Sequence, residues 1–264
     1  MTQLEGRNTV QPERLEKLIG QASESRHPEI FFVKRMKAAG PRLGVFASSF
    51  NPVTCAHLEL MRRAAEQYSL DEVIALAGIL NADKTTYDCP LSDRLKMLLL
   101  AIPDDAPVSV GISSSAFFVD MVEAITPCYP PDAEIYFVVG FDTFERILDP
   151  ENKYVNRYHR QFADRSGALN YLLERSHLIV AGRHAQGGRA LSGTAISHSF
   201  NCGKESQATL AGRILSLDFP DDLSERSASE VRQRVNAGLS IEGLVPPAAE
   251  RYIQEHRLYR ERHG

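Results

Sequence analysis

Six short apolar runs recur along the chain, and most of them are apolar on both faces rather than alternating. They are rich in Val and Ile and have the length of strands, at residues 42–48, 72–79, 108–113, 134–140, 177–183 and 213–219. Strands that are apolar on both faces are typical of a parallel sheet covered by helices on both sides. The pattern therefore predicts six strands of one buried sheet.

Segments with helical periodicity separate these strands. They cover residues 56–69, 91–102, 116–126, 159–174, 228–237 and 247–257. Alternating strands and helices indicate right-handed crossovers between parallel strands. We therefore predict a doubly wound, Rossmann-like α/β fold with helices on both faces.

Residues 1–40 precede the first predicted strand and carry two further helical patterns, PERLEKLIGQA and EIFFVKRMKAA. We interpret residues 1–40 as an N-terminal helical extension and residues 41–264 as the main domain. The segment 184–211 is rich in Gly, Ser and Ala and has no sustained period. Loops of that length are usually functional lids or disordered, and both interpretations stay open.

The composition and net charge of the chain disfavour several functional classes. The 264 residues include 43% hydrophobic and 24% charged residues, which is ordinary for a globular protein, and the formal net charge of -4 disfavours a nucleic-acid partner. No window approaches the roughly 18–20 apolar residues of a membrane span, and the N-terminus lacks the apolar core of a signal peptide. We therefore expect a cytoplasmic protein without a membrane partner.

The four cysteines, Cys55, Cys89, Cys128 and Cys202, are widely spaced and include no CxxC pair. This spacing indicates neither a zinc site nor a disulfide framework. We expect reduced thiols and assign no metal ligand.

The stretch GVFASSFNPVTCAHLELM, residues 44–61, joins the first strand of the main domain to its helix. Ligands of open parallel sheets bind beyond the carboxyl ends of the strands, where a helix N-terminus favours phosphate. The small residues Ser48 and Ser49 allow the backbone to approach such a ligand, and Pro52 restricts the turn. The joint therefore has the composition of a phosphate site.

Thr54 and His57 stand at the start of the helix that follows, three residues apart. A histidine donor beside a hydroxyl suits an oxygen that gains negative charge. A histidine at a helix start is also a common structural cap, so both interpretations stay open at this point.

The segment SSFNPVTCAHLEL resembles the N-terminal signature of the nicotinamide/nicotinate mononucleotide adenylyltransferases, in the nucleotidylyltransferase superfamily. That signature is Gly-(Ser/Thr)-Phe-(Asn/Asp)-Pro followed by (His/Thr)-x-x-His. Ser49 and Phe50 match its first half and Thr54 and His57 its second, whereas Ser48 stands where the family usually has glycine. The resemblance implies that residues 41–264 are a nucleotidylyltransferase-like domain, that Ser48, Ser49 and Phe50 bind the nucleotide, and that Thr54 and His57 are catalytic.

A second motif, SERSASEVRQRVNAGLSIEGLVPPAAERYIQEHRLY, is similar to the closing segment of the same family, Ser-Ser-Thr-x-(Ile/Val)-Arg followed by a Gly-Leu/Val-Pro turn. Ser227, Ser229 and Arg232 align with its first serine, its threonine and its arginine, while Ala228 replaces the second serine. The resemblance implies that Ser227 and Ser229 bind the nucleotide and that Arg232 is catalytic.

The residues of the second motif indicate an anion site independently of the family resemblance. Ser227 is a plausible N-cap, with Glu230 three residues later forming a capping box. Hydroxyls at a helix start beside the Arg232 guanidinium suit a polyphosphate. The alternative is a capped amphipathic helix with surface arginines.

Two segments between these motifs also resemble the family. ADKTTYDCPLSDRLKM places Lys84 in a loop and Arg94 on the next helix, and FVVGFDTFERI places Gly140 and Asp142 after a central strand. The resemblance implies that Lys84 reaches a phosphate and that Gly140 and Asp142 bind the nucleotide, with the carboxylate on ribose hydroxyls. The alternatives are a solvent-facing lysine, an arginine that pins its helix to the sheet, and an N-cap aspartate.

The resemblance implies attack of a mononucleotide 5′-phosphate on the α-phosphorus of ATP, with release of pyrophosphate. His57 and Arg232 would then neutralise charge on the transferring and leaving phosphates, without a covalent enzyme intermediate. Mg²⁺ would bind mainly through the nucleotide phosphates and water. The partners are small nucleotides, and a homo-oligomer stays open.

The acceptor substrate is the part of the implied reaction that the sequence defines least. The chain contains no Trp on which a pyridine ring could stack, so Phe117, Phe118, Tyr154 and Tyr158 are the candidate ring partners. Another phosphorylated acceptor, CTP as donor, and a non-catalytic nucleotide-binding regulator on the same fold stay open. A hydrolase is less well supported, because neither end motif places a carboxylate as general base.

Overall fold

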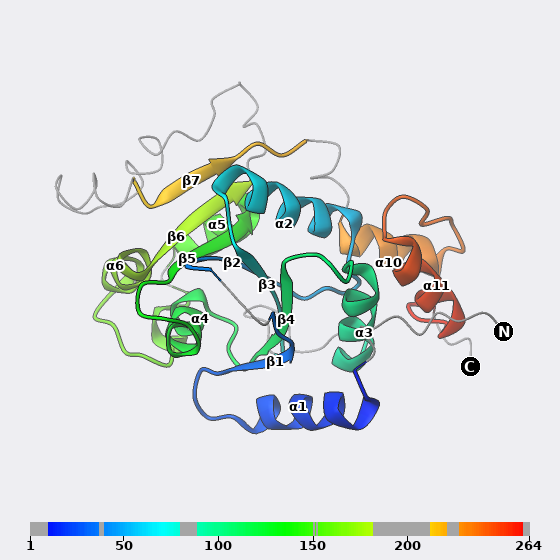
Figure 1. Cartoon of the computed structure of the whole chain (residues 1–264), viewed down its shortest axis with the longest axis horizontal. Coiled ribbons are helices and arrows are strands. Elements are labelled where there is room, and N and C mark those ends of the chain that lie inside the picture. The colour runs from blue at the N-terminus through cyan, green and yellow to red at the C-terminus, as the bar shows by residue number, and fades with distance from the viewer. Residues whose placement is uncertain are drawn as a thin grey trace.

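The described part of the molecule forms one seven-stranded sheet with helices on both faces (Figure 1). This arrangement confirms the predicted doubly wound α/β fold. The computed structural model describes residues 10–36, 40–79, 89–149, 151, 153–181, 212–220 and 227–260.

The sheet has the strand order β1-β4-β3-β2-β5-β6-β7, and every neighbouring pair is parallel except β1 with β4. Without β1 this is the 3-2-1-4-5-6 order of the doubly wound folds, and the order reverses between β2 and β5. The six predicted strands are thereby confirmed, with ends shifted by at most two residues. The strands are β1 (Ile30–Lys34), β2 (Arg42–Ser48), β3 (Glu72–Gly78), β4 (Val108–Ser113), β5 (Glu134–Gly140), β6 (Ser176–Ala181) and β7 (Ile214–Leu217).

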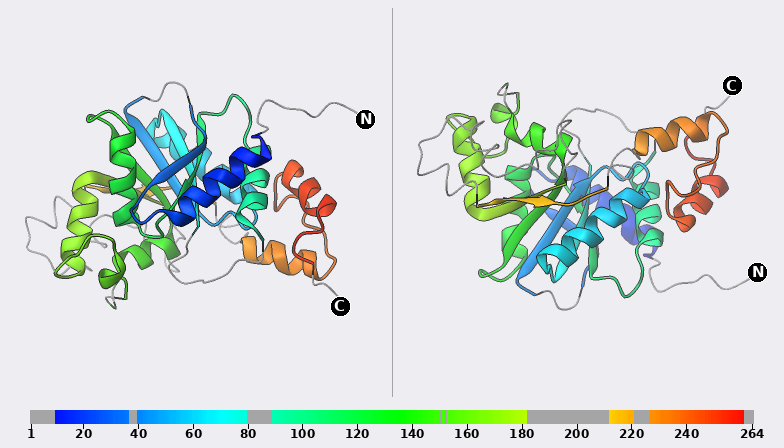
Figure 2. Two further views of the ribbon diagram at one scale, coloured as in Figure 1. Left: turned by 90° about the horizontal axis from the view of Figure 1, so that it is seen from below. Right: turned by 90° about the horizontal axis from the view of Figure 1, so that it is seen from above.

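Eight α-helices cover the two faces of the sheet in the described residues, and they include the six predicted for the main domain, four between strands and two after the last strand. One face carries α1, α2, α3, α10 and α11, and the other carries α4, α5 and α6. Both views of Figure 2 show α10 and α11 beside α3 at one side of the molecule. The helices are α1 (Pro12–Glu24), α2 (Cys55–Tyr68), α3 (Leu91–Ala101), α4 (Phe118–Ile125), α5 (Phe141–Leu148), α6 (Arg165–Arg175), α10 (Ala228–Asn236) and α11 (Pro247–Glu255).

The second helix predicted in the N-terminal extension, over EIFFVKRMKAA, is wrong at its start, because Ile30–Lys34 form β1. This strand runs antiparallel to β4, with Ile30 opposite Ser113. Phe31 and Val33 pack into the core on one face of the sheet, whereas Ile30 and Phe32 pack on the other. Because residues on both faces of this strand are apolar, the sequence does not show the alternation of apolar and polar positions that would identify a strand. The boundary of the extension at residue 40 stays a prediction.

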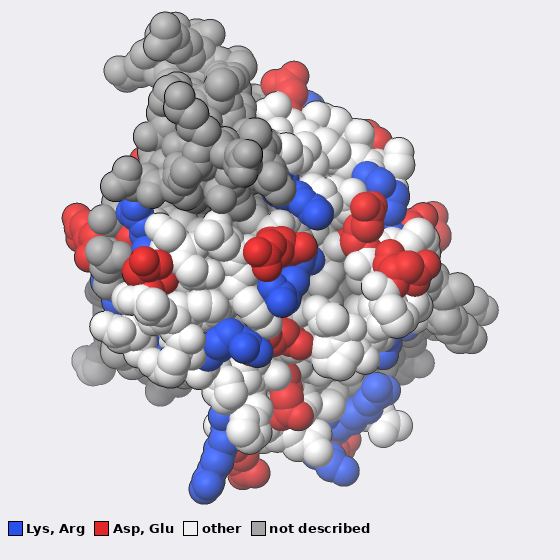
Figure 3. Space-filling view, turned by 90° about the vertical axis from the view of Figure 1, so that its left-hand side faces the viewer, with Lys and Arg blue, Asp and Glu red and all other residues white. Residues whose placement is uncertain are grey.

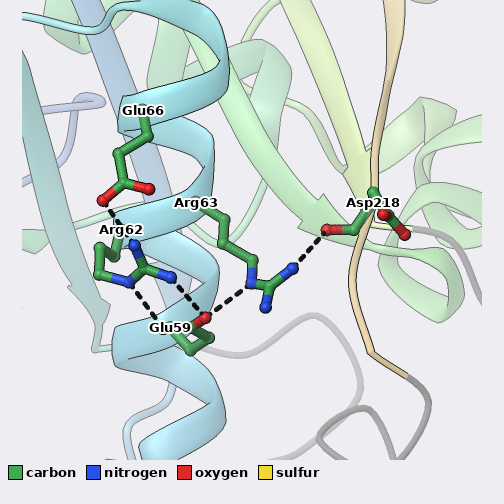
Figure 4. A network of polar contacts seen from close by, with 5 residues as sticks. All are labelled: Glu59, Arg62, Arg63, Glu66 and Asp218. Carbon is green, nitrogen blue, oxygen red and sulfur yellow. Dashed lines mark hydrogen bonds and ion pairs between the residues drawn. The ribbon is translucent and has the colours of Figure 1, made fainter.

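A network of hydrogen bonds and ion pairs connects charged side chains along α2 and reaches Asp218 after β7 (Figure 4). Arg62 and Arg63 both donate to Glu59, at 2.8 Å from Arg62 Nε and 2.6 Å from Arg63 Nε. Arg63 also reaches the carbonyl of Asp218, just after β7, at 3.5 Å. Exposed pairs of this kind contribute little individually, but together they tie α2 to the far strand of the sheet.

The charged side chains of one face and the membrane-spanning potential of the described helices bear on the partners expected from the sequence. Acidic and basic side chains intermingle over the face seen in Figure 3. Among the described residues, no helix has both the length and the apolar character that crossing a membrane requires.

Candidate active site

The residues of the first motif lie at the point where the strand order reverses. Ser48 ends β2, and Gly140 ends β5, the strand paired with it in parallel. Ser49 follows directly after β2. The carboxyl edge between these two strands is where doubly wound folds bind their ligands. The topology therefore brings Ser48, Ser49 and Gly140 together at one edge.

The ring of Phe50 packs in the core and anchors the loop. It is 0% exposed, and it stands edge-on to Phe46, with ring centroids 5.7 Å apart. The Phe50 φ of 44° is in the left-handed region, which turns the chain sharply after Ser49. The nucleotide contact implied for Phe50 stays a prediction.

Thr54 and His57 bond to each other across the first turn of α2. The Thr54 Oγ1 accepts from the His57 backbone N–H at 3.3 Å, and the His57 Nδ1 accepts from the Thr54 backbone N–H at 3.0 Å. This is a capping box in which a histidine occupies the position usually held by Glu or Gln. The cap and the candidate catalyst, left as alternatives by the sequence, are therefore the same residue.

Thr54 is the N-cap of α2 and orients His57. It is 1% exposed, and its hydroxyl oxygen accepts from the His57 N–H. Its backbone N–H fixes the orientation of the imidazole by donating to Nδ1. The catalytic role implied for Thr54 stays a prediction.

The bond from the Thr54 N–H also fixes the protonation of His57. Since Nδ1 is the acceptor, the neutral ring carries its proton on Nε2. Burial lowers the pKa of His57 from 6.5 to about 4, and Phe46 and Phe50 flank the ring at 5.6 and 5.4 Å between centroids. The unliganded protein therefore presents His57 as a neutral Nε2–H donor, and the positive charge of the site has to come from arginine.

Arg232 joins the second motif to the first. Its Nη1 donates to the carbonyl oxygen of Asn51 at 2.7 Å, across 181 positions of the sequence, and its Nη2 donates to the Ser229 Oγ at 3.2 Å. Asn51 lies in the loop between β2 and His57. The two ends of the chain thus meet at one joint, with a guanidinium at the edge of the candidate phosphate site.

Ser227 has the local role expected from the sequence. It is the N-cap of α10, and its Oγ accepts from the Glu230 backbone N–H at 3.1 Å. The Glu230 carboxylate accepts from Arg234 Nε at 3.0 Å rather than completing the predicted capping box. Ser227 and Ser229 are both exposed at the start of α10. Their contact with a nucleotide stays a prediction.

Three further residues hold the loop, and the sequence signalled only the first. Arg94, 2% exposed on α3, donates from Nη1 to the Ser49 carbonyl at 2.6 Å, so it pins the loop as well as its helix. The Leu244 carbonyl accepts from the Cys55 N–H at 2.9 Å. Tyr259 donates to Asn51 Oδ1 at 2.9 Å. Leu244 and Tyr259 both lie within the second motif as quoted, but nothing in that motif reveals that they contact the loop.

Gly140 and Asp142 stand at the start of α5. Gly140 is the N-cap, and a Cβ built on it meets no atom of another residue within 4 Å in the described structure. The backbone there has an ordinary φ of -75°, so the fold itself does not require glycine. Asp142 is exposed in the first turn and is not the N-cap. Open space at Gly140 and an exposed carboxylate two residues later stand at the carboxyl end of β5, as a ribose site would need.

The candidate ring partners divide into two groups. Phe117 lies just beyond β4 with its ring 5.9 Å from that of Tyr154 and 5.2 Å from that of Tyr158, and the guanidinium of Arg157 lies 5.3 Å above it. Phe118 instead packs edge-on against a core phenylalanine of β5. Phe117 is partly exposed, whereas Tyr154 and Tyr158 are buried behind it. Phe117 is therefore the partly exposed ring of this aromatic group, and it lies beside the Arg157 guanidinium.

Lys84 and the segment 184–211 lie outside the described residues. So does part of the stretch before Ser227, at residues 221–226. No group of three or more His, Cys, Asp and Glu side chains gathers within the described ranges in a way that would hold a metal ion. The expectation that the chain supplies no dedicated metal ligand stays a prediction.

Comparison with known proteins decides the family. Residues 45–234 match the model of the cytidylyltransferase-like family, a span that covers the first motif from Val45 onward and the second as far as Arg234, including Arg232. The chain belongs to the cytidylyltransferase-like family. This confirms the relationship inferred from the two motifs.

Curated relatives and solved structures agree with this assignment. A probable nicotinate-nucleotide adenylyltransferase of Geobacter sulfurreducens is 30% identical over 232 residues, covering 83% of this chain and 98% of the relative. One of Solibacter usitatus is 27% identical over 223 residues, with 83% and 99% covered. The Plasmodium falciparum nicotinic acid mononucleotide adenylyltransferase complexed with NaAD shares the fold, with a TM-score of 0.58 at 16% identity over 83% of this chain and 98% of that one.

The low pKa of His57 predicts a pH-dependent stability. Because folding lowers this pKa from 6.5 to about 4, the free energy of unfolding is unaffected above pH 6.5 and falls as the pH drops from 6.5 towards 4. His57→Gln keeps an acceptor for the Thr54 N–H but does not titrate. Urea unfolding at pH 7 and pH 5 should show wild type losing roughly 1 kcal/mol more than the variant, a value discounted because His57 is only partly buried. Equal losses in the two proteins would contradict the assignment.

Proposed function

We propose that this protein transfers the AMP moiety of ATP to nicotinate mononucleotide, forming the dinucleotide and releasing pyrophosphate. The observation that carries the proposal is the bond from Arg232 to the Asn51 carbonyl, which joins the two motifs at the carboxyl edge. The family assignment and the names of the relatives support this chemistry. Those names favour nicotinate mononucleotide over nicotinamide mononucleotide as acceptor.

The reaction needs positioning and charge compensation rather than a protein nucleophile. An oxygen of the acceptor 5′-phosphate attacks the α-phosphorus, the bond from that phosphorus to the bridging oxygen breaks, and pyrophosphate leaves with the electron pair. His57 donates a hydrogen bond from Nε2 to an α-phosphate oxygen. Arg232 supplies the full positive charge that offsets the charge growing on the leaving group. Thr54 holds the imidazole in the donor tautomer.

Mg²⁺ would enter with the ATP. The described residues offer only the exposed Asp142 carboxylate and hydroxyls at the edge between β2 and β5, which fits an ion held mainly by phosphates and water. Bound in that way, the ion would compensate charge on the triphosphate. The protein's own contribution is the arginine, the imidazole donor and the amides at the start of α2.

Phe117 and Arg157 support a pyridine carboxylate as the acceptor group. The partly exposed ring of Phe117 offers a stacking face beyond the carboxyl end of β4, and Arg157 lies 5.3 Å above the ring. A guanidinium held there suits the negative carboxylate of nicotinate better than a neutral amide. We therefore place the acceptor ring beside Phe117.

A nucleotide-binding regulator on the same fold is the second candidate. It is favoured by two departures from the family motifs, Ser48 in place of glycine and Ala228 in place of serine. Against it stand the neutral donor His57 and the cation Arg232, which binding alone does not need.

We further propose a cytoplasmic location and small nucleotides, not nucleic acid, as partners. CTP as donor and a homo-oligomer are left to experiment.

Pyrophosphate release tests the function. The purified protein is incubated with Mg²⁺, ATP or CTP, and separately nicotinate mononucleotide, nicotinamide mononucleotide or no acceptor. We expect release with ATP and nicotinate mononucleotide, and slower release with the amide. Release without acceptor would indicate a hydrolase. ATP binding without release for any pair would indicate the regulator.

Replacing His57 should affect turnover more than binding. His57→Ala removes one preorganised donor and is expected to lower kcat by about 10²–10³-fold while ATP still binds. His57→Gln keeps both an acceptor for the Thr54 N–H and an N–H donor, so it should retain more activity. Steady-state kinetics and calorimetric ATP binding check this result. A parallel loss of binding and turnover in both variants would make His57 purely structural.

Replacing Phe117 should affect only the acceptor. Phe117→Leu keeps apolar packing but loses the aromatic face, and we expect KM for nicotinate mononucleotide to rise about 2- to 10-fold. KM for ATP, measured on the same preparation, is the internal control and should not change. A rise in KM for ATP alone would move the acceptor ring elsewhere.

A further inference from the structure

The chain does not end at α11 but turns back towards the first motif. Beyond Glu255, two non-glycine residues adopt left-handed backbone conformations within three positions, Arg257 with φ 53° and Tyr259 with φ 62°. Such conformations cost about 1 kcal/mol or more each and persist only when their surroundings impose them. The Leu258 N–H bonds to the Ile253 carbonyl at 3.1 Å, which holds the turn against its helix.

This turn delivers the Tyr259 hydroxyl to Asn51. The hydroxyl donates to Asn51 Oδ1 at 2.9 Å, and Asn51 is only 4% exposed. Burial raises the pKa of Tyr259 well above its usual value, despite the opposing effect of Arg232 and Arg94 nearby. The phenol therefore remains a proton donor throughout the working pH range.

Asn51 carries two bonds of different origin. Its side-chain oxygen accepts from Tyr259, and its main-chain oxygen accepts from Arg232 at 2.7 Å. Two other anchors of the loop act two residues before Asn51, at the Ser49 carbonyl, and four residues after it, at the Cys55 N–H. Among the described side chains, Tyr259 is thus the one that fixes Asn51, whose carbonyl accepts the hydrogen bond from Arg232.

We propose that Tyr259 is a positioning residue for the reaction, because it holds Asn51 and through Asn51 sets where the Arg232 guanidinium stands relative to the transferring phosphate. This role rests on the proposed function. It assigns the C-terminal turn to the active site, although the turn supplies no group that touches substrate. A misplacement of about 1 Å by a remote group can lower a rate by up to about 10²-fold.

The α11 helix offers a matched control. Tyr252 is also buried, and its hydroxyl donates to Asp93 Oδ1 on α3 at 2.7 Å, away from the loop. Tyr252→Phe and Tyr259→Phe each remove one buried hydroxyl from the same C-terminal region. That hydroxyl bonds to Asp93 in the first case and to Asn51 and Cys89 in the second. Both should lower the free energy of unfolding by about 1 kcal/mol.

The experiment compares these variants in pyrophosphate release with ATP and nicotinate mononucleotide. We expect Tyr259→Phe to lower kcat by about 5- to 50-fold with KM for ATP changed by less than about twofold, since an orientation rather than a binding contact is lost. Tyr252→Phe should lower Tm by a similar amount yet keep wild-type kcat. A purely structural tyrosine would give both variants the same kinetics.

Coupling to Arg232 completes the test. In the Arg232→Lys background, Tyr259→Phe should add less than about twofold to the loss, because the group that it orients is already changed. Wild-type kcat in Tyr259→Phe, or full additivity with Arg232→Lys, would overturn the positioning role and leave the proposed function intact. An inactive wild type would overturn both, since no transfer reaction would remain for Tyr259 to assist.

Discussion

The hydrogen bond between Arg232 and the Asn51 carbonyl is the contact on which the site depends. It brings a cation from the C-terminal part of the chain to the loop that leads into His57. Neither motif forms the site alone, because the first supplies a neutral donor and small residues and the second supplies the charge. The fold makes the contact feasible by packing α11 against α3, whose Arg94 also grips the loop.

The loop after β2 is fixed by groups from several distant parts of the chain. Phe50 anchors it in the core, Arg94 binds the Ser49 carbonyl, and Tyr259 binds the Asn51 side chain. A loop held in this way keeps its geometry before the ligand arrives, which limits the ordering entropy that binding would otherwise require. Preorganisation is what a reaction without a covalent intermediate needs most.

The sequence predicted the fold well because buried parallel strands are apolar on both faces and stand out along the chain. The same property concealed β1, where Phe31 and Phe32 face opposite sides of the sheet. The helix α5 is absent from the helices predicted between the strands, because its first residues were read only as a turn after the central strand. The motifs pointed to the loop and the arginine that meet at this joint, but they did not reveal that Phe50 and Thr54 are buried. Burial depends on tertiary packing that a motif does not encode.

The tautomer of His57 has a stereochemical consequence. Its Nδ1 lone pair is committed to the Thr54 N–H, and its Nε2 carries the proton, so neither ring nitrogen offers electrons to phosphorus. A phosphohistidine cannot form on a ring held in this state. In the proposed reaction the two substrates must therefore exchange the group in one in-line displacement, and a chiral α-phosphorus would leave with its configuration inverted.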